Sequence, residues 1–92
     1  LIVCSGRLAG REFPLGAQGL TIGRGHNNDV QLKGSTVSRR HAVIRPARGR
    51  FFLQDQGSTT GTFVNGQRVN ATALKHGDRI RIGSMEFEFR VG

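Results

Sequence analysis

Short apolar runs separated by glycine-containing turns constrain the fold of this chain more than any other feature of the sequence. Fourteen of its 92 residues are glycine, and they punctuate the runs at short intervals. In the last run, from Met85 to Val91, apolar side chains alternate with charged ones, as in a strand with one buried face. No window shows sustained helical periodicity. Regularly spaced short strands with turn residues between them predict an all-β fold, an antiparallel β-sandwich of about ten or eleven short strands.

The turns between the expected strands carry their own signals. Asn65-Gly66 predicts a two-residue hairpin, because a type I′ turn needs positive φ at both of its central positions. His76, Gly77 and Asp78 predict the turn before the last hairpin. The expected strands are residues 1–4, 12–15, 20–22, 30–32, 42–45, 51–54, 63–64, 67–69, 79–82 and 85–91.

Three loop segments stand out between these strands. They are Gly23-Arg24, then Ser38-Arg39-Arg40-His41, then residues 57–62 with the sequence Gly-Ser-Thr-Thr-Gly-Thr, running on to Asn65-Gly66. Together they offer a guanidinium, several hydroxyls and unhindered backbone amides. These groups can hold a phosphate dianion without reacting with it.

Counting along the strands brings two of the three segments together. A strand leaving Ser38, a turn near residues 47–49 and a return through residues 51–55 form a hairpin. Ser38 and residues 57–60 therefore fall at the same end of the sheet. The same counting does not place Arg24, which is separated from Ser38 by another short strand.

The order and spacing of the three segments resemble the forkhead-associated (FHA) domain family over nearly the whole chain. Thr60 stands where that family usually has Asn. The resemblance implies a non-catalytic module that binds phosphothreonine peptides and recruits proteins phosphorylated by Ser/Thr kinases. It also brings Arg24 to the same end as Ser38.

The resemblance also implies roles for individual residues. Arg24 binds the phosphate through its planar fork, Ser38 and Thr59 through their hydroxyls, and Arg39 through its backbone amide or side chain. Thr60 replaces an Asn that contacts the peptide backbone, and a hydroxyl has a shorter reach than an amide. We therefore expect Thr60 to alter recognition of the peptide backbone, while phosphate binding is retained. The residues expected to support the site structurally are Gly23, His41, Gly57, Gly61, Asn65 and Gly66, with Asp55 bracing the loop from Gly57 to Gly61.

The net charge of +8, from twelve arginines and two lysines against six acids, predicts an anionic partner. Arg39, Arg40, Arg45, Arg48 and Arg50 form a basic cluster along the expected hairpin. This cluster is either a solvated face, a surface preferring acidic residues beside the phosphothreonine, or a site for a nucleic-acid backbone. Six phenylalanines without Trp or Tyr indicate that the aromatic rings serve the core, which counts against nonspecific nucleic-acid binding.

Several other classes of protein are disfavoured. The single Cys4 cannot form an internal disulfide, and the sequence has no metal-ligand spacing, paired carboxylates, nucleophile beside a base or nucleotide-binding loop. We therefore expect no enzyme activity, cofactor, metal or small-molecule substrate. We expect a single domain over residues 1–92, cut from a larger cytoplasmic protein, monomeric and without membrane contact. Phosphorylation-independent docking remains an alternative, as does nucleic-acid binding.

Overall fold

The computed structural model describes residues 2–3 and 10–90, which form ten strands in two five-stranded sheets. The strands are β1 (Ile2–Val3), β2 (Leu20–Gly23), β3 (Val30–Gln31), β4 (Ala42–Ala47), β5 (Arg50–Asp55), β6 (Thr62–Val64), β7 (Gln67–Val69), β8 (Ala71–Ala73), β9 (Arg79–Ile82) and β10 (Met85–Glu88). This arrangement confirms the all-β sandwich predicted from the spacing of the apolar runs.

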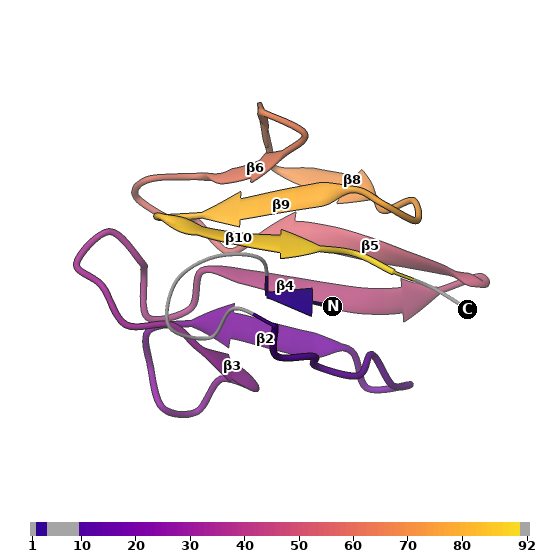
Figure 1. The fold of residues 1–92 in the computed structure, drawn as a ribbon, viewed down its shortest axis with the longest axis horizontal. Helices are drawn as coiled ribbons and strands as arrows, with labels where there is room; N and C mark the ends of the chain where they lie inside the picture. Colours follow the sequence, from indigo (N-terminus) through magenta and orange to yellow (C-terminus); the bar gives the residue numbers. More distant parts are fainter. Residues whose placement is uncertain (1, 4–9, 91–92) are drawn as a thin grey trace.

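The two sheets form two layers (Figure 1). One has the strand order β1-β10-β9-β6-β7 and the other β3-β2-β4-β5-β8. Every pairing is antiparallel except that of β2 with β3, in which Ile22 lies opposite Val30. The prediction of an antiparallel sandwich is therefore wrong for this one pair, because the chain crosses over between β2 and β3 instead of turning back in a hairpin.

The β4–β5 hairpin spans the second sheet. Its register runs from Ala42 opposite Asp55 to Ala47 opposite Arg50. The two-residue turn between the strands, Arg48-Gly49, has φ of 52° and 75°, the double positive φ of a type I′ turn. The hairpin therefore holds the chain before Ala42 and the chain after Asp55 at one end of the molecule, and the turn at the other (Figure 1).

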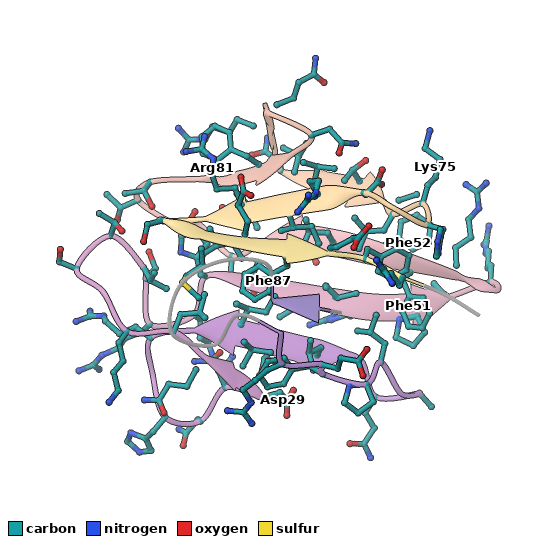
Figure 2. All side chains as sticks on the ribbon, in the orientation of Figure 1. Asp29, Phe51, Phe52, Lys75, Arg81 and Phe87 are labelled. Atoms are coloured by element: carbon teal, nitrogen blue, oxygen red, sulfur yellow. The ribbon has the colours of Figure 1, made fainter. Side chains whose placement is uncertain are left out.

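The core fills the space between the sheets and consists of their inward-facing side chains. Phe87 and Phe89 are its largest members, and Phe87 lies between the two layers in Figure 2. Ile22, Ile44 and Leu53, from three adjacent strands of the second sheet, are fully buried against them. Burial alternates residue by residue along β9, as a period-two pattern predicts, whereas the first three residues of β4 are all buried.

Two of the predictions about strands fail for identifiable reasons. Residues 12–15 do not form a strand, and Pro14 within them has no N–H to donate to a ladder. β8 was not predicted, because Ala-Thr-Ala contains no large apolar residue. The last strand ends at Glu88, and the predictions that involve Cys4 and Val91 fall outside the described residues.

The prediction that the aromatic rings serve the core is wrong for two of the six. Phe87 and Phe89 are buried, and Phe13 and Phe51 pack partly against the core. Phe63 lies on the outer face of the first sheet beneath the guanidinium of Arg81, 4.3 Å from the ring centroid. Phe52 is 37% exposed on the outer face of the second sheet. Strand alternation explains both, because each ring occupies a position of outward register.

Candidate functional site

Arg24 lies directly beside Ser38. β2 ends at Gly23, and the chain then continues alongside the segment that leads into β4. The backbone N–H of Arg24 donates to the carbonyl of Ser38 over 3.0 Å, and that of Gly25 donates to the carbonyl of Arg39 over 3.1 Å. The position of Arg24, which strand counting could not supply, is thus fixed by two backbone hydrogen bonds.

Gly23 permits this close approach. A Cβ added at Gly23 would stand 2.2 Å from the carbonyl oxygen of Arg39, closer than any real contact. Asn28 holds the same junction from the other side, because its Nδ2 donates to the carbonyls of Gly25 over 2.8 Å and Arg39 over 2.7 Å. Sequence reasoning missed Asn28, although an Asn in a loop rich in Gly and Asn is a common source of such side-chain to backbone bonds.

Ser38 and Thr59 meet across the site. The backbone N–H of Thr59 donates to the Oγ of Ser38 over 3.2 Å. A hydroxyl oxygen that accepts one hydrogen bond still has its own hydrogen to donate. Ser38 is half-buried and Thr59 is exposed, so both can reach a ligand from solvent.

His41 connects the two loops from beneath. Its side chain is fully buried, and its Nδ1 accepts a hydrogen bond from the backbone N–H of Ser38 over 3.1 Å. Nε2 therefore carries the hydrogen of the neutral ring and donates it to the carbonyl of Gly61 over 2.8 Å. Both ring nitrogens are engaged in holding the loops, which leaves neither for metal binding or proton transfer.

Asp55 braces the loop from Gly57 to Gly61. Its carboxylate accepts hydrogen bonds from the hydroxyl and backbone N–H of Ser58 and from the hydroxyl of Thr62. Burial raises the pKa of Asp55, but the hydrogen bonds from Ser58 and Thr62 outweigh it and hold the pKa below its usual value. The Oγ of Ser58 in turn accepts the N–H of Gly61, which closes the loop.

Thr60 is turned toward its own protein. Its hydroxyl donates to the carbonyl of Thr36 over 2.6 Å, linking the loop that contains Thr59 to the loop before Ser38. The one hydrogen that Thr60 can donate is therefore already committed. Gly57 and Gly61 flank this segment with φ of 71° and 93°.

Asn65 and Gly66 lie away from these loops. They form the predicted turn, with φ of 51° and 84°, at the far end of β6 from Gly61. The side chain of Asn65 donates to Asp78 and accepts the backbone N–H of Arg79, both over 3.0 Å. These contacts support the turn before β9, so the structure does not bring Asn65 or Gly66 to the other predicted site residues.

A cavity of about 350 Å³ opens beside Arg24 and Arg39. Its remaining lining residues are Gly25, His26, Asn27 and Gln31. None of the described residues that line it is an acid, and the nearby Asp29 accepts hydrogen bonds from the backbone and hydroxyl of Thr21. The cavity therefore suits an anion, and its polar residues on the β2–β3 loop were not identified from the sequence.

The basic cluster of the sequence is divided in the structure. Arg39 and Arg40 lie in the loop before β4, whereas Arg48 lies in the turn at the other end of the hairpin. Six residues of strand, about 20 Å at 3.3 Å per residue, separate the two groups. Only the first group adjoins Arg24 and Ser38.

Over residues 2–3 and 10–90, no three His, Cys, Asp or Glu side chains are grouped as a metal site would require. The described strands and loops also include no helix long and apolar enough to cross a membrane.

Comparison with known proteins gives consistent matches. A family model of the FHA domain matches residues 20–83. The oxoglutarate dehydrogenase inhibitor of Corynebacterium glutamicum is 41% identical over 92 residues, which is all of this chain and 64% of that protein. The first three curated relatives are longer, since the chain spans 10%, 64% and 65% of them.

Solved structures agree with the sequence matches. A structure from an analysis of phosphothreonine-dependent FHA domain interactions has a TM-score of 0.90 at 36% identity, covering 99% of this chain and 93% of that one. Mycobacterium tuberculosis EmbR in complex with a low-affinity phosphopeptide has a TM-score of 0.84 at 41% identity, covering 88% of this chain and 22% of that one.

Proposed function

The chain belongs to the FHA domain family, and on this premise we propose that it binds phosphothreonine-containing segments of proteins modified by Ser/Thr kinases. Binding recruits the modified protein and involves no covalent chemistry. The similar structures described with phosphothreonine-dependent interactions and with a bound phosphopeptide support this proposal. In the chain itself, the observation that carries it is the fixed junction of Arg24, Ser38 and Thr59.

Each of these residues has a distinct part in the proposed complex. The Arg24 guanidinium pairs with the phosphate dianion, and its planar fork can donate two hydrogen bonds at once. The hydroxyls of Ser38 and Thr59 donate to further phosphate oxygens, and Arg39 adds its backbone amide or side chain. Because hydrogen bonds within the protein already hold the backbone at Arg24 and Thr59 and the hydroxyl of Ser38, little ordering of the backbone is needed on binding.

Calorimetry with a matched peptide pair tests the proposal. A phosphothreonine peptide should bind, and its unmodified twin should not. Arg24→Ala should weaken the phosphopeptide by roughly 10- to 100-fold, which corresponds to about 1.5–3 kcal/mol for hydrogen bonds to charged groups. Arg90→Ala is the matched control, because it removes the same charge from an exposed side chain paired with Glu88. Equal affinity for both peptides would rule out phosphate recognition.

We further propose that the chain acts as the phosphothreonine-reading part of a longer protein. The curated relatives support this, because the matching region is only a part of each. What the rest of such a protein does is a separate question from what this site binds.

A further inference from the structure

A hollow of about 350 Å³ lies on the outer face of the second sheet. The apolar side chains of Phe52, Ala47 and Ala71 line it together with Arg45 and Gln54, while the side chain of Leu53, between Phe52 and Gln54 on β5, is buried in the core. It is formed by β4, β5 and β8. It includes none of the residues assigned to phosphate binding.

Strand register explains why the sheet is hollowed here. Phe52 lies opposite Arg45 on β4 and opposite Ala73 on β8, and Gln54 lies opposite Ala71. A bulky ring therefore stands beside a strand whose outward residues are small. The methyl groups of β8 cannot fill the space next to the phenyl ring.

Phe52 is exposed to a degree that is unusual for a residue of its size. Among residues 10–90, Phe52 is an exposed large apolar residue, with 37% of its surface accessible to solvent. A single exposed apolar residue is ordinary on protein surfaces. Phe52 differs because it borders a hollow with further apolar lining, so a ligand side chain placed there would bury apolar surface on several sides.

The charge around the hollow is positive. Arg45 forms part of its wall, and Arg48 and Arg50 follow at the hairpin turn. Within residues 10–90, no carboxylate lines the hollow. Asp55, the acid on β5, is turned to the other side of the strand, where it bonds Ser58 and Thr62. A second copy of this chain, itself at +8, would be repelled from this face, whereas an acidic segment would be attracted.

The hollow and the phosphate site are separate places on the molecule. Phe52 lies three residues, about 10 Å, along β5 from Asp55, on the outer face of the sheet. Figure 2 shows Phe52 toward the end of the molecule that carries the β4–β5 turn, with Lys75 at the same end. The loops with Ser38 and Thr59 lie at the opposite end (Figure 1).

We propose that this hollow docks an acidic segment of a partner protein that carries an aromatic or aliphatic anchor residue, without any requirement for phosphorylation. The anchor packs beside Phe52 and against Ala47 and Ala71. Carboxylates of the segment pair with Arg45 and with the arginines of the turn.

Selection from a display library of random, unphosphorylated dodecapeptides tests this proposal. The bait is the whole chain with Arg24→Ala, which removes the phosphate-binding guanidinium, and the counter-selection uses Arg24→Ala combined with Phe52→Ser. Enriched peptides should carry net negative charge and at least one aromatic or large aliphatic residue. A synthesised peptide should lose at least tenfold in affinity with Phe52→Ser or Arg45→Glu in the otherwise wild-type chain. The same peptide should bind Arg90→Glu, a matched charge reversal outside the lining of the hollow, with wild-type affinity.

Ala71→Glu is a second variant that does not depend on removing the ring. It places a carboxylate in the hollow at an exposed position and should abolish binding of the acidic peptide. The proposal is overturned if no enriched peptide depends on Phe52, if the enriched peptides are neutral or basic, or if Arg45→Glu and Ala71→Glu leave binding unchanged. Since the probe has no phosphate and the bait lacks Arg24, the result is independent of phosphothreonine recognition.

Discussion

Gly23 is the residue on which the geometry of the phosphate site depends most directly. Gly23→Ala would place a methyl group 2.2 Å from the carbonyl oxygen of Arg39, which must then move. We expect a loss of roughly 1–3 kcal/mol in the free energy of unfolding, the usual cost of overpacking. We also expect weaker phosphopeptide binding, because Arg39 and Ser38 move together. Urea unfolding and calorimetry measure the two effects.

Gly16→Ala is the matched control for this substitution. Gly16 is exposed, and a Cβ there would meet no atom within 4 Å. Its unfolding free energy and its phosphopeptide affinity should stay close to those of the wild type. If Gly23→Ala also left both quantities unchanged, the close approach at Gly23 would not be needed for stability or for binding.

Thr60 allows a test of peptide reading at a single position. Its hydroxyl hydrogen is committed to Thr36, so it cannot donate to a peptide backbone. Thr60→Asn supplies an amide that donates and accepts, and should raise phosphopeptide affinity by about 2- to 12-fold, the equivalent of one hydrogen bond of 0.5–1.5 kcal/mol. Thr60→Val removes the hydroxyl without adding an amide and should lower stability with no gain in affinity. A Thr60→Asn chain that binds no better than Thr60→Val would contradict the expected role of this position.

Asp55 should make stability depend on pH in the acid range. Because its pKa is lowered in the folded protein, its stabilising contribution is complete above the ordinary carboxyl pKa of about 3.9. That contribution is lost as the pH falls from there through the lowered value. Asp55→Asn cannot accept both Ser58 bonds and should cost roughly 1–3 kcal/mol near neutral pH. Urea unfolding of both proteins between pH 7 and pH 2 should show the difference shrinking below about pH 4, and a constant difference would argue against this role.

Among the elements, the Asn65-Gly66 hairpin is expected to contribute to the stability of the fold and not to phosphopeptide binding. Asn65→Ala removes the bonds to Asp78 and Arg79 and a residue suited to positive φ. We expect a loss of about 1–3 kcal/mol in the free energy of unfolding. Phosphopeptide affinity of the folded protein should stay unchanged, since the turn lies at the far end of β6. If calorimetry showed that Asn65→Ala also lowers phosphopeptide affinity, Asn65 would be needed to hold the binding loops.

The strands differ in how well the sequence predicted them, and the reason is physical. β4, β5 and the turn between them followed from two short apolar runs and a glycine, which are features of a few neighbouring residues. β8 has only Ala-Thr-Ala, and it is a strand because β5 offers a ladder of hydrogen-bonding partners to it. The same small residues leave the hollow beside Phe52. Because the sequence pattern did not predict β8, it did not predict the hollow that β8 helps to form.

At the scale of the whole molecule, the excess of arginine governs how partners approach. The radius of gyration is 11.7 Å, while the Debye length falls from about 30 Å at 0.01 M salt to about 10 Å at 0.1 M. The field of the +8 charge therefore reaches about three times farther from the protein surface at 0.01 M salt than at 0.1 M. Stopped-flow measurements over this range should show the association rate with a phosphothreonine peptide falling severalfold, and the dissociation rate changing much less. An unchanged association rate would mean that net charge does not steer the encounter.

The sequence by itself determined the local features of this protein. Turn residues and period-two alternation predicted the strands and the sandwich, and the order of three loop segments indicated the family. Only the tertiary structure decided that Arg24 lies against Ser38, that Thr60 bonds to Thr36, 24 residues away, and that Phe52 borders a hollow. Turn chemistry is encoded by adjacent residues, whereas the partner of a loop side chain depends on which strands pair and on which face each residue emerges. These contacts join segments far apart in the chain, so they exist only once the two sheets have packed.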